Sequence, residues 1–306
     1  MKKPSRALLI VNASSRQGAA DLTDVKTLLE RRGLALHQVT PENAAGVASL
    51  IERHAPDVDR VIVGGGDGTL NCAAGALVKS GLPLGILPLG TANDLARTLG
   101  LPSDVRDAAE VIANGHAREV DVGCVNGVYF FNAADVGLGA RVTARLDRET
   151  KSRWGILAYP HGVMSAWREH RAFAARVRCE GHEEIMRVIE LKIANGKYYG
   201  GGTPVLEDAA IDDERLDLLA IRPLGFFRLL KIALALRAGA ARDAEGVRVR
   251  SGRRIEITTR KPMDVSTDGE IRTTTPARFH ILPRAIKVFA PATDRENTED
   301  PGHAHE

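Results

Sequence analysis

The segment Gly64-Gly65-Gly66-Asp67-Gly68-Thr69-Leu70-Asn71 joins an apolar run, residues 61–63, to an expected helix over residues 70–78. A strand, a glycine-rich turn and a helix in this order form a phosphate site, because the backbone can approach the anion and free N–H groups at the helix start face it. Asp67 would repel a phosphate unless a cation lies between them, and Mg²⁺ is the usual bridge. The segment therefore predicts binding of a nucleotide phosphate together with Mg²⁺.

Two common phosphate-binding motifs are excluded by the same segment. It lacks the Gly-Lys-Ser/Thr ending of a Walker A loop, and Thr69 and Asn71 stand where the dinucleotide fingerprint continues toward its last glycine. A purely structural turn is the alternative interpretation. Three consecutive glycines followed by Asp-Gly-Thr favour the phosphate site over that alternative.

Strands and helices alternate around this segment. We expect strands over 7–11, 35–39, 61–63 and 84–87, and helices over 20–32, 42–54, 70–78 and 103–115, with Ser103 as a cap and Gly33 after the first helix. This order predicts a doubly wound α/β domain with a parallel sheet. Ligands of such sheets bind at the carboxyl ends of the strands, where the loops after residues 11, 63 and 87 meet.

The pattern changes near residue 120 to short, closely spaced strands. Hairpins are expected at Asn126-Gly127, within 121–132, and at Asp268-Gly269, between 263–267 and 271–275; further strands are expected over 173–179, 185–194, 216–221, 247–249 and 255–258. Two helices, 154–170 and 225–238, interrupt them. The fold class is therefore α/β plus all-β, with an α/β domain over 1–124, an antiparallel β-sandwich over 125–284 and a disordered tail over 291–306.

Composition limits the possible functions. The chain has 306 residues, which suits two domains, and a net charge of +3 with 4% aromatic residues gives no indication of a nucleic-acid partner. Cys72, Cys124 and Cys179 are scattered, as expected of reduced thiols in a cytoplasmic protein. The apolar run 7–11 is too short for a signal peptide, and no run approaches the ~18 residues of a membrane span.

Two longer motifs carry a family resemblance. Gly64–Thr69 and Leu87-Pro88-Leu89-Gly90-Thr91-Ala92-Asn93-Asp94-Leu95-Ala96-Arg97 resemble the diacylglycerol kinase catalytic family, and within it the bacterial YegS-type lipid kinases. The similarity continues through 194–196, 200–202, 212–213 and Asp268-Gly269-Glu270. It implies an ATP-binding domain over 1–124, a lipid-substrate domain over 125–284, and a last strand over 285–290 that returns to the first domain. The implied reaction is Mg²⁺-dependent transfer of the ATP γ-phosphate to a hydroxyl of a glycerol-containing lipid.

The resemblance also implies a role for individual residues. It gives ATP contacts to Asn12, Thr40, Gly64, Gly65, Gly66, Asp67, Gly68, Thr69, Leu70 and Thr91. It places Asp67 and Asp94 around the catalytic Mg²⁺ and makes Glu270 the general base. It implies a structural Mg²⁺ held by Asp213 and by the carbonyls of Ala210 and Arg215.

Each of the acidic residues has an alternative interpretation. Asp94 is also placed to cap a helix, and Glu270 follows the hairpin turn Asp268-Gly269. The acidic run around Asp213 also reads as a solvated loop, and Glu214 stands there where the family usually has glycine. The loop after Asn12 departs from the family pattern as well, which motivates the hypothesis of a non-catalytic nucleotide- or lipid-binding module.

The partner of the chain follows from the kinase hypothesis. A lipid kinase meets its substrate at a membrane, so we expect a cytoplasmic protein that is peripheral at the inner membrane face. The helix over 225–238, with Phe226 and Phe227 beside basic residues, either packs with a solvated basic edge or lies against an anionic membrane. A small-molecule kinase of the NAD kinase type, which shares the Gly-Gly-Asp-Gly-Thr segment, is the alternative enzyme.

Overall fold

The computed structural model describes residues 5–12, 22–140, 171–204, 206, 209–238, 240, 242 and 244–292. The chain divides into two compact units: the first contains Met1–Val120 and Ile286–Glu306, and the second contains Asp121–Ala285. Among the described residues, no helix is both long enough and apolar enough to cross a membrane.

The first unit is built on a parallel sheet. Its strands lie in the order β2 (Leu34–Val39), β1 (Ser5–Val11), β3 (Arg60–Gly65), β4 (Leu84–Pro88) and the last part of β18 (Ala277–Phe289). The central strands are buried along most of their length, which explains why they read as continuous apolar runs rather than alternating ones.

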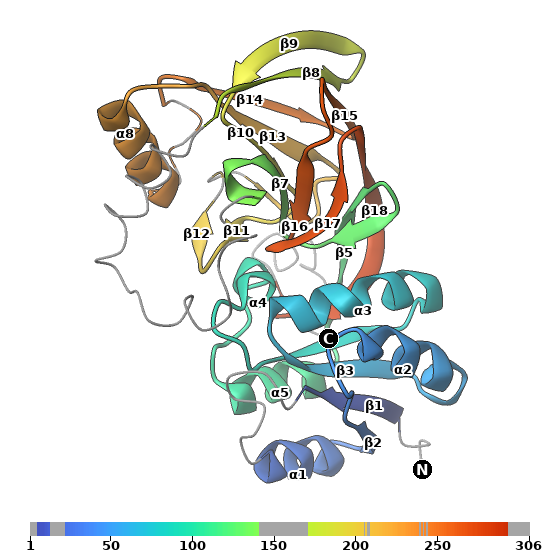
Figure 1. The fold of residues 1–306 in the computed structure, drawn as a ribbon. Coiled ribbons are helices and arrows are strands. Elements are labelled where there is room, and N and C mark those ends of the chain that lie inside the picture. Colours follow the sequence, from blue (N-terminus) through green and yellow to red (C-terminus); the bar gives the residue numbers. More distant parts are fainter. Residues whose placement is uncertain are drawn as a thin grey trace, which may run out of the picture. The chain divides into compact units, whose positions relative to one another are not determined.

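Helices cover both faces of this sheet (Figure 1). The helices α1 (Thr23–Arg31) and α5 (Val105–Asn114) share a buried cluster with alternate residues of β1. The helices α2 (Gly46–His54) and α3 (Asp67–Ser80) pack beside each other on the other face, and the 3₁₀ turn Ala55–Asp57 follows α2. The expected α/β domain with a parallel sheet is confirmed.

Three helix starts differ from the prediction. α2 begins at Gly46 because the Asn43 side chain accepts the Gly46 N–H at 3.1 Å, so the preceding residues form a turn. α5 is capped by Asp104 instead of Ser103, since its carboxylate accepts the N–H groups of the next turn. α3 begins at Asp67 and thus includes half of the glycine segment.

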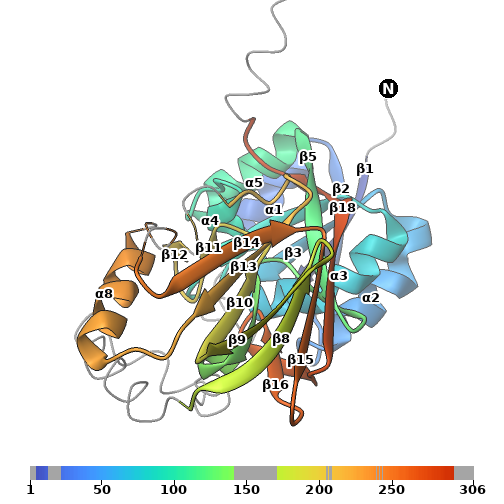
Figure 2. The ribbon, with the colours of Figure 1, turned by 90° about the horizontal axis from the view of Figure 1, so that it is seen from above.

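The second unit contains two antiparallel sheets (Figure 2). One has the order β14 (Val247–Gly252), β13 (Leu216–Ile221), β10 (Glu190–Ala194), β7 (Ala133–Gly137), β16 (Asp264–Thr267) and β17 (Glu270–Thr274). The other contains the first part of β18 with β15 (Arg254–Thr259), β8 (Phe173–Cys179) and β9 (His182–Val188). Two strand pairs and one helix complete the description: β5 (Ala117–Val125) with β6 (Val128–Phe130), β11 (Tyr198–Tyr199) with β12 (Thr203–Pro204), and α8 (Phe226–Arg237).

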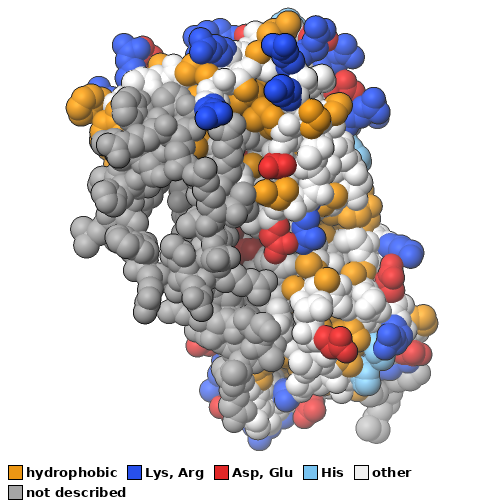
Figure 3. Space-filling model, in the orientation of Figure 1, with side chains coloured by type: hydrophobic (Ala, Val, Ile, Leu, Met, Phe, Trp, Pro, Cys, Tyr) orange, Lys and Arg blue, Asp and Glu red, His pale blue; other side chains and the backbone are white. Residues whose placement is uncertain are grey.

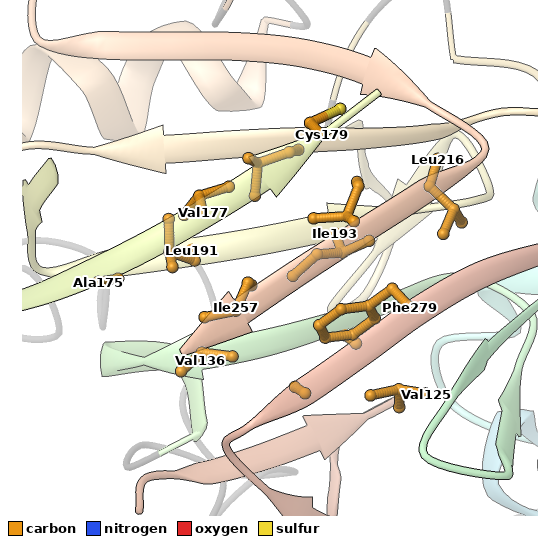
Figure 4. Packing of buried hydrophobic residues seen from close by; sticks show 14 of the residues in the cluster. Val125, Val136, Ala175, Val177, Cys179, Leu191, Ile193, Leu216, Ile257 and Phe279 are labelled. Carbon is orange, nitrogen blue, oxygen red and sulfur yellow. The ribbon is translucent and has the colours of Figure 1, made fainter. Parts of the chain in front are cut away.

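The two sheets bury their apolar faces against each other (Figure 4). Val136, Leu191 and Ile193 come from the first sheet, while Ile257 and Phe279 come from the second, and all five are essentially inaccessible to solvent. The expected antiparallel sandwich is therefore confirmed.

The sandwich departs from the sequence prediction in two places. The single strand expected over 185–194 is two strands, β9 and β10, which belong to different sheets. Apolar and polar residues alternate over 186–193 except at Val188 and Ile189, which are both buried, and the change of sheet falls at this break in the alternation. The central strand β7 was not predicted. The helix expected over 154–170 and the tail from 293 onward lie outside the described residues.

Candidate active site

The glycine segment passes very close to the turn that follows β4. A Cβ atom on Gly90 would lie 2.5 Å from the Gly66 Cα, and one on Gly66 would lie 3.0 Å from the Gly90 Cα. Gly64, Gly65 and Gly66 do not adopt positive φ. Glycine is therefore required here for the approach of one backbone to another, and not for a left-handed turn.

Asn12 fastens the glycine segment to the end of β1. Its backbone N–H donates to the Gly64 carbonyl at 2.9 Å, and its side-chain amide donates to the Thr69 hydroxyl at 2.9 Å. A Cβ on Gly65 would lie 2.7 Å from the Thr69 Cβ, so this packing is tight. The structure thus gives Asn12 and Thr69 a role in holding the segment, and their contact with a nucleotide stays a prediction.

The turn after β4 is shaped by Asn93, a residue that the sequence prediction did not include in the site. Asn93 is left-handed, with φ of 51°, and its side chain both accepts the Gly90 N–H at 3.0 Å and donates to the Gly90 carbonyl at 3.1 Å. It is the N-cap of α4 (Asp94–Thr98). Asp94 is thus the first helical residue, and its interpretation as the cap is wrong. An asparagine directly before Asp-Leu was the available signal.

Asp67 and Asp94 form an acidic pair, in which Asp94 is buried and Asp67 is half-buried. The Asp67 carboxylate accepts the Leu95 N–H at 3.1 Å, at the start of α4. Burial raises the pKa of Asp67, the charge of Asp94 raises it further, and backbone N–H groups offset part of the rise. Two adjacent carboxylates supply the hard oxygen ligands that Mg²⁺ prefers, and a cation would remove their repulsion. The described residues contain no group of three or more His, Cys, Asp or Glu placed to bind a metal. The pair therefore fits a Mg²⁺ that takes its other ligands from water and phosphate.

The remaining predicted nucleotide contacts lie around the same strand ends. β1, β3 and β4 are parallel and in register, with Val11 opposite Gly64 and Gly65 opposite Pro88. Thr40 directly follows β2, Thr91 lies in the turn after β4, both are exposed, and Gly68 is half-buried. Leu70 is buried and its N–H donates to the Gly66 carbonyl at 3.1 Å. The structure thus brings these residues to one edge of the sheet, and their nucleotide contacts stay predictions.

Glu270 begins β17 in the second unit. Asp268 and Gly269 have φ of 45° and 82°, so the expected tight hairpin turn between β16 and β17 is confirmed. The Glu270 carboxylate is half-buried and forms an ion pair with Arg272 at 2.5 Å. Nothing in this geometry conflicts with a base, and that role stays a prediction.

Asp268 holds the Glu270 turn in place. Its carboxylate accepts the N–H groups of Phe131, Asn132 and Ala133 at 2.9, 2.9 and 3.0 Å, directly before β7. The partners are more than 130 positions away in the sequence. No local pattern could therefore have revealed this function of Asp268.

The acidic loop before β13 is ordered by Asp121, which the sequence analysis did not single out. Asp121 is fully buried, and its carboxylate accepts the N–H groups of Glu214 at 2.6 Å and Arg284 at 2.7 Å. Glu214 has a φ of 59°, a left-handed conformation that glycine adopts more easily than glutamate.

Asp213 lies in that loop and has a raised pKa. Burial raises its pKa to about 6, with smaller contributions from Asp217 and Asp121, although its carboxylate accepts the Arg215 N–H at 3.0 Å. A cation would offset this repulsion, so the residue fits a Mg²⁺ ligand. The participation of the Ala210 and Arg215 carbonyls stays a prediction.

Comparison with known proteins identifies the family. The diacylglycerol kinase catalytic domain matches residues 6–125, and the YegS C-terminal NAD kinase beta sandwich-like domain matches residues 132–290. The chain belongs to the diacylglycerol kinase catalytic-domain family. It is thus a kinase of a lipid-kinase family, and the resemblance found in the two sequence motifs is confirmed.

Individual relatives agree with this assignment over most of the chain. A Chromohalobacter salexigens protein named "Probable lipid kinase YegS-like" is 32% identical over 292 residues, which is 92% of each chain. An uncharacterized Synechocystis protein is 32% identical over 239 residues, and the match spans 76% of this chain but 54% of that protein. The crystal structure of a diacylglycerol kinase from Bacillus anthracis superposes with a TM-score of 0.81 at 26% identity and covers 95% of this chain and 99% of that one.

Proposed function

We propose that this chain is an ATP- and Mg²⁺-dependent lipid kinase that transfers the γ-phosphate to a hydroxyl of a glycerol-containing lipid of the diacylglycerol or phosphatidylglycerol type. The observation that carries the proposal is the Asp67–Asp94 pair beside the Gly66–Gly90 contact, at the carboxyl ends of β3 and β4. Glycine backbone, helix starts and paired carboxylates together suit a phosphate chain with its metal.

The residues of the first unit would bind and orient the nucleotide. Asp67 and Asp94 would hold the catalytic Mg²⁺, which when bound neutralises the charge of the phosphates. The glycine segment and Thr91 would fix the phosphates, with Thr40 at the neighbouring strand end. Asn12 would keep the glycine segment in the shape that binding requires through its bonds to Gly64 and Thr69.

Glu270 would supply the proton acceptor for the lipid alcohol. An alcohol is a poor nucleophile until its proton can leave, and a carboxylate within hydrogen-bonding distance provides that path. The turn geometry supports this role, because Asp268 and Gly269 fix the position of the side chain that follows them. Asp213, with the carbonyls of Ala210 and Arg215, would hold a second, structural Mg²⁺ in the same unit.

The acceptor would be reached at a membrane. The proposal places the enzyme in the cytoplasm, in peripheral contact with the inner face of the membrane that contains its lipid. A small-molecule kinase is the second candidate, because the match to the second unit is described as NAD kinase-like.

Transfer of ³²P from [γ-³²P]ATP to total membrane lipids tests the proposal. We expect a labelled glycerolipid with the purified chain and Mg²⁺, no label after EDTA, and loss of label in Asp67→Asn. NAD in a parallel reaction tests the small-molecule alternative. Label on NAD alone would replace the proposal by that alternative, and ATP binding without transfer to any acceptor would favour a non-catalytic module.

A further inference from the structure

The helix α8 is apolar on two opposite faces. On its inner side, Leu229, Ile232 and Leu236 follow helical spacing and pack on a buried cluster that includes Leu219 and Ile221 of β13. Ile232 is 3% exposed. This apolar face explains why the helix is attached to the sandwich. Of the two interpretations of the segment 225–238, the packing of the helix is thus confirmed.

The outer side of α8 exposes large hydrophobic side chains. Phe227 is 77% exposed and Leu234 is 56% exposed, and a spacing of seven residues places them on the same face. Only Ile185 and Ile271 share this property among the described residues. Figure 3 shows hydrophobic side chains at the edge of the molecule where Figure 1 places α8. Packing of the helix does not require these side chains, so their exposure needs another explanation.

Positive charge accompanies the exposed side chains. Lys231 is exposed, lies one turn after Phe227 and makes no ion pair with the described residues. Arg228 pairs with Glu245 at 3.0 Å, but both side chains are more than half exposed, so the pair is weak. The surroundings of the exposed Ile185 differ from those of α8, because the arginines there are paired with the neighbouring Glu183 and Glu184.

We propose that Phe227, Lys231 and Leu234, here called the α8 patch, dock the enzyme on an anionic membrane surface. The inference rests on the proposed lipid substrate, whose acyl chains keep it in a bilayer. Insertion of two apolar side chains with a lysine at headgroup level is the way an interfacial helix binds. Three side chains on one helix face cover far less than the ~800 Å² per partner of a stable protein interface, which argues against a second copy.

The test is co-sedimentation of the full chain with vesicles. We expect Phe227→Gln/Leu234→Gln to lower binding to phosphatidylglycerol-containing vesicles at least about tenfold, since the apolar insertion is lost. Lys231→Gln should lower it about fivefold, and only where the vesicles are anionic. Ile185→Gln is the matched control, an exposed hydrophobic residue of the same unit, and should bind like the wild type.

A second measurement separates docking from catalysis. Phosphate transfer to a short-chain diacylglycerol dissolved as monomers should persist in the α8 double variant, while transfer to the same lipid class in vesicles should fall with binding. Equal vesicle binding by the wild type and the double variant would overturn the docking proposal. It would also be overturned if the wild type formed dimers and the main effect of the double substitution were to separate them. Absence of transfer to either acceptor by the wild type, with docking still dependent on the α8 patch, would overturn the proposed function alone.

Discussion

The glycine segment of the first unit and the Glu270 turn of the second unit are held in different ways. The glycine segment is held by bonds within the first unit: Asn12, directly after β1, donates to the Thr69 hydroxyl, and the Thr69 N–H donates to the Gly66 carbonyl inside the segment. The Glu270 turn depends on Asp268 and three N–H groups more than 130 positions earlier. The glycine motif and the Asp268-Gly269 turn can both be read from the sequence, but the bonds that anchor the turn cannot, because their partners lie far away in the chain. Substitutions at the glycine segment should therefore mainly reduce activity, while removal of the Asp268 bonds should mainly reduce stability.

Asp67→Asn is expected to have the largest effect. The amide oxygen can still accept the Leu95 N–H, but the charge that faces the cation is lost, so kcat/KM should fall about 10²–10³-fold while the fold persists. Steady-state kinetics over a Mg²⁺ series measures this. Asp104→Asn is the matched control, because it also changes a carboxylate that caps a helix and should leave activity unchanged.

Asp268→Ala should destabilise the second unit by about 2–4 kcal/mol, since three N–H groups lose their acceptor. Urea unfolding measures the loss, and Asp264→Ala, an exposed residue at the start of the same strand, should cost little. A stable Asp268→Ala protein would show that the turn does not depend on the long-range bonds.

Gly90→Ala should cost about 1–3 kcal/mol and weaken nucleotide binding, because its Cβ would lie 2.5 Å from a backbone atom that cannot move independently. The control is Gly46→Ala in the same unit, where a Cβ meets nothing closer than 3.8 Å. Calorimetric titration with ATP and thermal unfolding compare the two. Equal ATP affinity and equal thermal stability of the two variants would show that the close Gly66–Gly90 contact is not required.

Asp213→Asn should have the smallest effect and a defined pH dependence. The folded-state pKa of Asp213, about 6, lies above its ordinary value of 3.8, so the folded state binds this proton more tightly and stability falls as pH rises from about 4 to about 6. Solvent screens the Asp213 carboxylate, which is only partly removed from water at the surface, and limits the effect to about 1 kcal/mol. Unfolding is measured in EDTA at pH 4 and at pH 7. Between these two values the free energy of unfolding should decrease less in Asp213→Asn than in the wild type or in Asp57→Asn, the exposed control. Added Mg²⁺ should stabilise the wild type at pH 7 and not Asp213→Asn.

Local patterns predicted both folds and singled out the residues that the structure brings together at the end of the parallel sheet, whose nucleotide contacts stay predictions. Apolar strand runs and the glycine segment determine the parallel sheet, and Asp67 is visible because a carboxylate in a phosphate loop needs an explanation. Asn93 and Asp104 were missed because several polar residues are available at each turn, and only the folded backbone decides that Asn93 bonds Gly90 and that Asp104 caps α5.

Long-range features of the second unit could not be predicted. The break between β9 and β10 is marked in the sequence only by the adjacent apolar residues Val188 and Ile189, a pair that a continuous strand could also contain. Asp121 and Asp268 bind backbone groups brought close only by the tertiary fold.

The central claim is that nucleotide binding and proton removal depend on separate parts of the chain, and Glu270→Gln tests it most directly. Single-turnover transfer from [γ-³²P]ATP to a lipid acceptor should fall roughly 10²–10⁴-fold, while calorimetric ATP affinity with Mg²⁺ stays as in the wild type. Undiminished transfer by Glu270→Gln, or a loss of ATP affinity that accounts for the lower rate, would contradict the claim.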